Sequence, residues 1–488
     1  MKKYFLSFLL LAACGFLYAQ NLDALRETIS KNPAVKDAQY SVYARYIGGE
    51  DIISINPDSR LSAASILKLY TTAAALDILG PDYRFKTEVY ISGKQKGAVV
   101  YGDIYIKGGG DPTLGSIRLL GTPGLEELTD GWAQKIKELC IKKIEGAIYA
   151  DNSIFSGTML PWRTSFQNIG NYYAAPVDGL SARDNSYEIY FEPARTEGEI
   201  AKVLKLDPHI KGIEIKSYVK AYSRPGSEVI HVNFNPGSNS LSVVGGIKLS
   251  QKPLEVSAAM PSPALFLADY LKEKLEAEGV KVKGAPAVTA PDTYDDKKLI
   301  LTHLSPPLWE IIKYTNKRSF NLYADIMVYA ISAFKGGPGA ARDGILRIKD
   351  FLARLNIDST NFNVFDGSGL SRDNITSCAV TVNLLEAMRS SPHKDIFYDS
   401  LPVAGDPFDS GNMWKRLRDS NAALNARVKT GSLDRARSHA GYVKDKDGRD
   451  IVFCIVTNNF KGNAWDVSVM HEEIINSLAG LTGLSGKK

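Results

Sequence analysis

The stretch that decides the fold lies at residues 65–79 and reads SILKLYTTAAALDIL. Its alanine run is among the strongest helix formers, and the Gly-Pro pair at 80–81 is typical of a helix end. These features predict a helix from Leu67 to Leu79 that Ser65 opens. A spacing of three residues places Ser65 and Lys68 on one face of that helix.

Ser65 and Lys68 have the chemistry of a nucleophile and its base. A serine hydroxyl attacks a carbonyl only when a base takes its proton, and a lysine withdrawn from water beside another cation can be that base. At a helix start, the backbone N–H of Ser65 is also available to an oxyanion. Taken alone, however, the string favours a serine near the cap of a core helix followed by a solvated lysine, because Ser-x-x-Lys recurs at four other places. These are Ser217/Lys220, Ser332/Lys335, Ser391/Lys394 and Ser485/Lys488.

A second string, Ser319-x-Asn321, follows a polar run at 314–318 and precedes an apolar segment, Leu322 to Ala333. This setting predicts a loop that exposes Ser319 between two helices. The alternative is a polar turn that merely caps the second helix.

The third string, Lys429-Thr430-Gly431, occurs once and is followed by Ser432. Its surroundings predict a hairpin, with a buried strand from Ile451 to Val456. Glycine lets a substrate backbone lie close to a strand edge, and lysine offers a point charge to a carboxylate. The alternative is an ordinary edge-strand lysine before a turn.

In this order the three strings resemble the signature set of penicillin-binding proteins and serine β-lactamases. More closely, the chain resembles the class C low-molecular-mass penicillin-binding proteins, the D-alanyl-D-alanine carboxypeptidase/endopeptidase family. Ser319 lies 254 residues after Ser65, a gap that this family fills with inserted domains. Four further segments match the family, at 79–85, 108–114, 175–177 and 366–373.

The resemblance implies an α/β (α+β) fold with a transpeptidase domain like that of penicillin-binding proteins and serine β-lactamases. That domain has an antiparallel sheet with helices on both faces and an all-helical half, and it carries a large inserted region of two smaller domains. The expected limits are 1–19 for a signal peptide, 20–87 and 291–488 for the catalytic domain, 88–178 and 256–290 for an α/β insert, and 179–255 for a nested β-rich domain.

The resemblance also implies how the residues act. Ser65 would attack the carbonyl between two D-alanines with Lys68 as its base, and β-lactams would acylate Ser65 and leave slowly. Ser319 would pass a proton to the leaving amine, and Asn321 would hold Lys68 and the substrate amide in register.

Substrate binding would fall to the third string. Lys429 and Thr430 would bind the terminal carboxylate, Gly431 would let the peptide lie close, and the N–H of Ser432 would complete the oxyanion hole with that of Ser65. The expected partners are peptidoglycan peptide stems and β-lactam antibiotics as covalent inhibitors.

Two positions depart from the family pattern. Many relatives carry an acidic residue where this chain has Asn168, and that carboxylate is thought to meet a cationic group of the peptide stem. Preference for a diamino-acid stem is therefore not implied here. The middle residue of the second string, Phe320, is bulkier than usual, and its side chain is expected to point into the core.

Composition agrees with a globular, exported enzyme. The chain has 488 residues, 44% of them hydrophobic, which is enough for several cores. A net charge of +5 without a Lys/Arg-dense arm argues against nucleic acid. The six histidines show no metal spacing, no phosphate loop is convincing, and no cofactor is expected. His439 is interpreted as structural, and the cysteines other than Cys14 imply no disulfide framework.

The first 19 residues read as a secretory signal, which implies a periplasmic protein cleaved after Ala19. Lipidation at Cys14 is the alternative, and it is disfavoured because apolar rather than polar residues follow that cysteine. No transmembrane span is expected after signal removal. The apolar stripe of a terminal helix, Trp465 to Ala479, is interpreted as core rather than anchor.

Three other functions fit parts of the pattern. A serine β-lactamase would share the strings, but the long gap and the lack of an obvious deacylating glutamate argue against it. A non-catalytic peptidoglycan-binding protein would not need Ser65, Lys68 and Lys429 intact. A lipase-like esterase would need a Gly-x-Ser-x-Gly motif on a strand-to-helix turn.

Overall fold

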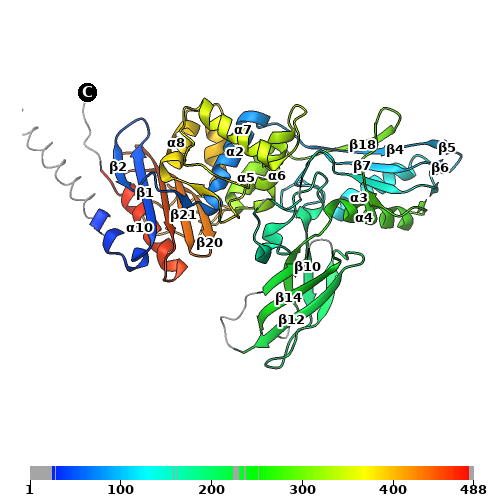
Figure 1. Ribbon diagram of the computed structural model, residues 1–488, viewed down its shortest axis with the longest axis horizontal. Coiled ribbons are helices and arrows are strands. Elements are labelled where there is room, and N and C mark those ends of the chain that lie inside the picture. The colour runs from blue at the N-terminus through cyan, green and yellow to red at the C-terminus, as the bar shows by residue number, and fades with distance from the viewer. Residues whose placement is uncertain are drawn as a thin grey trace, which may run out of the picture. The chain divides into compact units, whose positions relative to one another are not determined.

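The structure is a computed structural model that describes residues 25–482, except 28, 158, 162, 224–229, 236–237 and 251. The predicted signal peptide, 1–19, and Cys14 therefore lie outside the described residues. The chain divides into two compact units (Figure 1). The first unit falls within 1–78, 312–320 and 345–488, and the second comprises 79–311 and 321–344.

The first unit is built on a five-stranded sheet in the order β2-β1-β22-β21-β20, and every neighbouring pair is antiparallel. An N-terminal hairpin receives the C-terminal strands, because β1 pairs with both β2 and β22. The strands are β1 (Gln39–Tyr46), β2 (Asp51–Ile55), β20 (Arg427–Leu433), β21 (Ala436–Lys444) and β22 (Asp450–Asn458).

Helices cover both faces of this sheet (Figure 1). Successive side chains of a strand point to opposite faces, so β22 contributes to both cores. Phe453 and Ile455 pack with the stripe of α10 (Ala464–Ala479), whereas Cys454 lies beside Cys378 of α8 (Cys378–Arg389). The terminal stripe is therefore core, as predicted. Among the described residues, no helix is long and apolar enough to cross a membrane.

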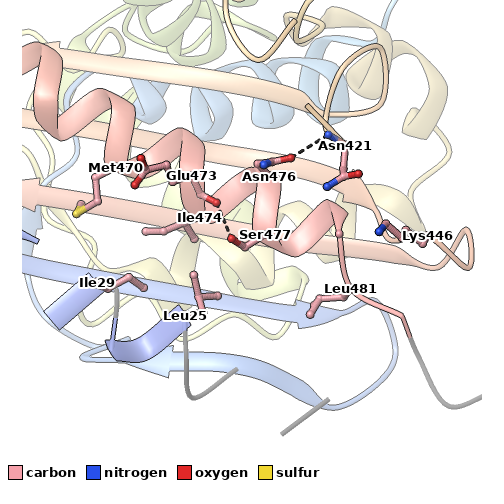
Figure 2. Close-up of a pocket in the computed structure, with 11 residues that line it drawn as sticks. Leu25, Ile29, Asn421, Lys446, Met470, Glu473, Ile474, Asn476, Ser477 and Leu481 are labelled. Atoms are coloured by element: carbon pink, nitrogen blue, oxygen red, sulfur yellow. Dashed lines mark hydrogen bonds between the residues drawn. The ribbon is translucent and has the colours of Figure 1, made fainter. Parts of the chain in front are cut away.

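Figure 2 shows a pocket of about 370 Å³ at the C-terminal end of α10. Leu25 and Ile29 line it from the N-terminal side of the chain, and the backbone N–H of Asn421 donates to Asn476 Oδ1 beside it at 2.8 Å. None of the predicted site residues lines this pocket.

The helix predicted from Leu67 to Leu79 and the apolar segment from Leu322 to Ala333 both form helices within one residue of those limits. Ser65 is the main correction: it lies in a 3-10 turn, η2 (Ala64–Leu67), and the α-helix starts only at Lys68. A short helix, α9, was not predicted from the sequence. The observed helices are α2 (Lys68–Leu79), α5 (Leu308–Arg318), α6 (Asn321–Ala333), α7 (Ala341–Arg354), α8 and α9 (Lys394–Ser400).

The second unit holds a mixed five-stranded sheet, a smaller four-stranded sheet and two helices that pack against each other, α3 (Leu125–Lys137) and α4 (Pro263–Ala277). The larger sheet has the order β17-β9-β7-β4-β18, from Ala287–Val288, Ile148–Asp151, Ile104–Lys107, Lys86–Ile91 and Lys298–Leu304. The smaller has the order β16-β8-β6-β5, from Lys281–Val282, Lys143–Ile144, Val99–Tyr101 and Lys94–Lys96.

Two three-stranded sheets follow within 186–259, and no described residue of that range is helical. The first, β11-β10-β15, comes from Val203–Asp207, Ser186–Phe191 and Leu254–Ala259. The second, β12-β14-β13, comes from Glu214–Tyr222, Ser240–Lys248 and Ile230–Phe234. The β-rich character agrees with the strand pattern of the sequence, while the exact domain limits stay a prediction.

A buried carboxylate follows the glycine triplet at 108–110. Asp111 Oδ1 accepts from the N–H and hydroxyl of Thr113, but Oδ2 has no hydrogen-bond partner among the described residues. The nearest cationic candidate, His303 Nε2, is 3.9 Å away, and burial lowers the pKa of His303, which favours its neutral form. Burial raises the pKa of Asp111 from 3.8 to about 6, against the opposing effect of the Thr113 hydrogen bonds.

We expect Asp111→Asn to stabilise the second unit at pH 8. A raised pKa in the folded state gives stability that is present below pH 3.8 and is lost as the pH rises through about 6. The amide keeps an acceptor for Thr113 without the buried charge. Urea unfolding should show a gain of roughly 1–3 kcal/mol at pH 8 that vanishes towards pH 4. The exposed control, Asp292→Asn, should leave the free energy of unfolding unchanged at pH 8 and at pH 4. A stabilisation by Asp111→Asn that is equal at both pH values would contradict the prediction.

Candidate active site

Ser65 lies in a tight turn that presents its hydroxyl to Lys68. The preceding residue, Ala64, has φ +49°, a conformation that is unfavourable for a residue with a Cβ and that occurs mainly where surrounding structure enforces it. Lys68 then begins α2, and its Nζ donates to Ser65 Oγ at 3.0 Å. The Lys68 side chain is 0% exposed. The predicted nucleophile and base are therefore in direct contact.

A second loop supports Lys68 from the segment 366–374. Lys68 Nζ donates to the carbonyl of Ser368 at 2.6 Å. Asp366 holds that loop, because its carboxylate accepts from the backbone N–H of Gly369, the backbone N–H of Ser371 and the amide of Asn374, each at 2.7 Å. Burial raises the pKa of Asp366, while these hydrogen bonds and the charge of Lys68 act in the opposite direction.

The sequence reasoning missed the contact of this loop with Lys68. It used the segment 366–373 only as a family motif and assigned no role to Asp366 or Ser368. The signal that was available is its polar, glycine-rich composition, which predicts a tight turn but not the partner of that turn.

Lys429 connects the third string to the second. Its side chain is also 0% exposed, and its Nζ donates to Ser319 Oγ at 2.8 Å and to the carbonyl of Thr430 at 2.8 Å. Burial, and secondarily the charge of Lys68, hold the pKa of Lys429 well below its usual range. Each of the two buried lysine amines is thus hydrogen-bonded to a serine hydroxyl. The two amines lie close enough for the charge of Lys68 to lower the pKa of Lys429.

Ser319 occupies the predicted turn between α5 and α6. Its φ of +56° is unusual for a residue that is not glycine. The following ring, Phe320, packs nearly perpendicular to Tyr314 with centroids 5.8 Å apart and is only half-buried. The expectation that Phe320 points into the core is thus met in part, because its ring packs on a neighbouring helix but keeps some exposure.

Two glycines pack against the backbone of Ser65. A Cβ at Gly431 would lie 2.2 Å from Ser438 Oγ and 2.9 Å from the Ser65 nitrogen. Gly369 has φ +84°, and a Cβ there would lie 2.0 Å from the carbonyl oxygen of Ala64. Both positions therefore require glycine for steric reasons.

Strand β20 is the edge of the sheet, so one side of its backbone is not paired to another strand. Its Val428 N–H points to that side, where it donates to Pro402 O at 2.8 Å. Because strand geometry repeats every two residues, the N–H groups of Thr430 and Ser432 point the same way. Thr430 Oγ1 accepts from Asn412 Nδ2 at 2.6 Å, and Ser432 is exposed.

Asn321 is counted with the second unit, where it begins α6. Its Nδ2 donates to the carbonyl of Tyr173 at 2.8 Å. Asn168 lies five residues earlier on the same segment, with its Oδ1 3.5 Å from the Tyr173 hydroxyl. The structure thus gathers Ser65, Lys68, Ser319 and the third string in the first unit, and it places Asn321 beside the segment that carries Asn168.

His439 does not point to these hydroxyls. Its Nδ1 lies 2.9 Å from Nδ1 of His471, whose Nε2 lies 2.9 Å from Thr457 Oγ1. Burial, together with nearby arginines and Lys429, lowers the pKa of His439 to about 3, so the ring is neutral. Within the described ranges, no three acidic, histidine or cysteine side chains gather as metal ligands do.

Two proteins of known name resemble this chain over most of its length. A D-alanyl-D-alanine carboxypeptidase from Actinomadura sp. (strain R39) is 29% identical over 456 residues, which are 91% of this chain and 82% of that protein. The D-alanyl-D-alanine carboxypeptidase DacB of Haemophilus influenzae is 25% identical over 429 residues, 86% of this chain and 85% of the relative.

Solved structures confirm the predicted fold class. The crystal structure of penicillin binding protein 4 (dacB) from Haemophilus influenzae has a TM-score of 0.80 at 23% identity, and covers 94% of this chain and 99% of that chain. The same protein has also been solved in complex with a β-lactam, with a TM-score of 0.76.

The family comparison extends over nearly the whole chain and matches residues 20–477. With the serine and lysine pairs described above, it confirms the resemblance drawn from the three strings. The chain belongs to the D-Ala-D-Ala carboxypeptidase 3 (S13) family of serine peptidases.

Proposed function

We propose that the reaction of this family runs here through an ester of Ser65. The observation that carries the proposal is the 3.0 Å contact between Ser65 Oγ and the amine of the fully buried Lys68. An amine withdrawn from water loses the solvation that favours its charged form, and only the neutral form can accept a proton. Lys68 takes the proton of Ser65 as Oγ bonds to the carbonyl carbon between two D-alanines.

The tetrahedral oxyanion is held by two backbone N–H groups, those of Ser65 and Ser432. Support for the first comes from its place at the start of a helical turn, and support for the second from the open edge of β20. One such donor is worth about 3 kcal/mol of transition-state stabilisation.

Collapse of this intermediate breaks the peptide C–N bond, and the leaving D-alanine amine takes a proton from Ser319. The contact of Ser319 with Lys429 supports this step, since the buried amine can return a proton to the hydroxyl. Lys429 and Thr430 bind the terminal carboxylate, and Asn321 orients the substrate amide. Water then attacks the ester carbonyl and passes a proton through Ser319 to Lys429, which gave one up during acylation. The bond from the carbonyl carbon to Ser65 Oγ breaks, Lys68 returns its proton to Oγ, and the shortened peptide leaves.

We further propose the substrate, the inhibitors and the cellular location of the enzyme. Peptidoglycan stems are the substrate and β-lactams are slow covalent inhibitors, as the β-lactam complex of the Haemophilus influenzae protein supports. A signal peptide at 1–19 would direct the enzyme to the periplasm, with lipidation of Cys14 as the less favoured alternative. We also propose the domain limits that the sequence predicts. They are 20–87 and 291–488 for the catalytic domain, 88–178 and 256–290 for the α/β insert, and 179–255 for the nested β-rich domain.

Fluorescent penicillin should label the purified mature protein, and Ser65→Ala should abolish the labelling, because no ester can form. Ser217→Ala is the matched control, since Ser217 also heads a Ser-x-x-Lys string, and it should label normally. An intact protein without label, or a labelled Ser65→Ala, would exclude the acyl-enzyme. Release of D-alanine from a pentapeptide, compared with cleavage of cross-linked dimers, then separates carboxypeptidase from endopeptidase activity.

Replacement of Gly431 by alanine should slow acylation by about 10- to 100-fold, because the added Cβ displaces β20 from the Ser65 backbone. The matched control is Gly462→Ala in the same unit, where an added Cβ has no neighbour within 4 Å. Rates of penicillin labelling measure both variants. Equal rates for Gly431→Ala and the intact protein would show that this close packing does not matter to the reaction.

A further inference from the structure

A loop at 405–413 precedes β20 and touches two parts of the active site. The N–H of Gly405 donates to the carbonyl of Met413 at 3.1 Å and closes the loop at its base. Phe408 at its tip is 96% exposed, so apolar burial does not hold the tip in place. Met413 at the base of the loop is buried in the core, and Asp409 and the exposed Asn412 add two polar attachments between base and tip.

The first attachment is an ion pair between Asp409 and Lys317. The two side chains are 6% and 4% exposed, so the pair is withdrawn from water. Asp409 Oδ1 also accepts from the Gly411 N–H at 2.6 Å, which fixes the orientation of the carboxylate. Burial lowers the pKa of Lys317, Asp409 raises it, and the charges of Arg427 and Lys313 lower it further. Asp409 is therefore the group that compensates the Lys317 charge.

Lys317 lies in the last turn of α5, two residues before Ser319. The ion pair thus ends next to the turn that holds Ser319 at φ +56°. A non-glycine residue keeps such a conformation only when its surroundings enforce it. On its other side, the same loop holds β20 through the amide of Asn412, which donates to Thr430 Oγ1 at 2.6 Å.

Stability alone gives little reason for such a pair. A buried ion pair loses solvation that its attraction barely recovers, and apolar replacements of similar volume are often neutral or stabilising. What a buried pair supplies is a fixed geometry between two segments. Here the segments are the Ser319 turn and the loop that contacts Thr430.

We propose that Asp409 is a positioning residue for acylation. Through Lys317 it holds the Ser319 turn so that Ser319 Oγ stays 2.8 Å from Lys429 Nζ, in place to protonate the leaving group. This inference rests on the proposed function of Ser65, Ser319 and Lys429. Asp409 itself touches none of the reacting atoms in this account.

The first test compares Asp409→Asn with the intact protein and with Asp406→Asn. Asp406 belongs to the same loop, but its carboxylate accepts a local backbone N–H, that of Phe408 at 2.9 Å, and forms no ion pair within the described part of the chain. We expect penicillin acylation to slow by about 10- to 100-fold in Asp409→Asn and to stay unchanged in Asp406→Asn. Labelling of Asp409→Asn should still reach one label per molecule at long times, because Ser65 and Lys68 are intact.

A double variant, Lys317→Met with Asp409→Leu, separates positioning from stability. It removes both buried charges, so its thermal midpoint should recover to that of the intact protein, while acylation stays slow. Asp409→Glu, which keeps the charge, should recover part of the rate. These two variants decide the question even if Asp409→Asn does not fold.

Different results of these experiments would overturn different proposals. No labelling of the intact protein would overturn the proposed function itself. Normal labelling of the intact protein together with an unchanged rate in Asp409→Asn would overturn only the role of Asp409. A double variant that regains both its midpoint and its rate would show that the pair serves stability alone.

Discussion

The burial of two lysine amines close together is the constraint on which this site depends. Lys68 and Lys429 are both fully buried, and the charge of Lys68 contributes to the lowered pKa of Lys429. Each amine must find acceptors in place of water, since an unpaired buried ammonium is very costly. Lys68 uses a carbonyl of the 366–374 loop, and Lys429 uses a carbonyl of its own strand.

The burial of the two amines also explains why each one contacts a serine hydroxyl. Each amine has a hydroxyl as a further partner, Ser65 for Lys68 and Ser319 for Lys429. A hydroxyl can accept from an ammonium or donate to a neutral amine, so the pairs tolerate either protonation state. Mutual repulsion favours a state in which one amine is neutral. The packing of the site therefore lets each amine exchange a proton with the serine hydroxyl that it contacts.

Close backbone packing brings these groups together. Gly431 and Gly369 leave room for β20 and the 366–374 loop to lie directly on the Ser65 turn. The positive φ of Ala64 and of Ser319 shows that both serines sit on turns that their surroundings enforce. Rigid neighbours, rather than the local preference of each serine, therefore set the positions of both hydroxyls.

Much of this could be predicted from the sequence, because its signals are local. Helix limits follow from periodicity and caps, as for α10, and the hairpin of β21 and β22 follows from its turn residues. The 3-10 turn at Ser65 was not predicted, and its close contact with Gly431 of β20 is not visible in the local sequence. The order and spacing of the three strings indicated the family, but not what surrounds each lysine.

What the sequence could not show is contact between distant segments. Asp366 lies near Lys68 although about 300 residues separate them in the chain, as the Lys68 contact with Ser368 shows. Asp409 and Lys317 are 92 residues apart, and each alone reads as a solvated surface charge. Only the fold removes both from water, and burial turns an ordinary aspartate and lysine into a restraint. The catalytic strings are thus readable in sequence because their chemistry is specific, whereas the groups that position them are common residues whose meaning arises only from their place in the fold.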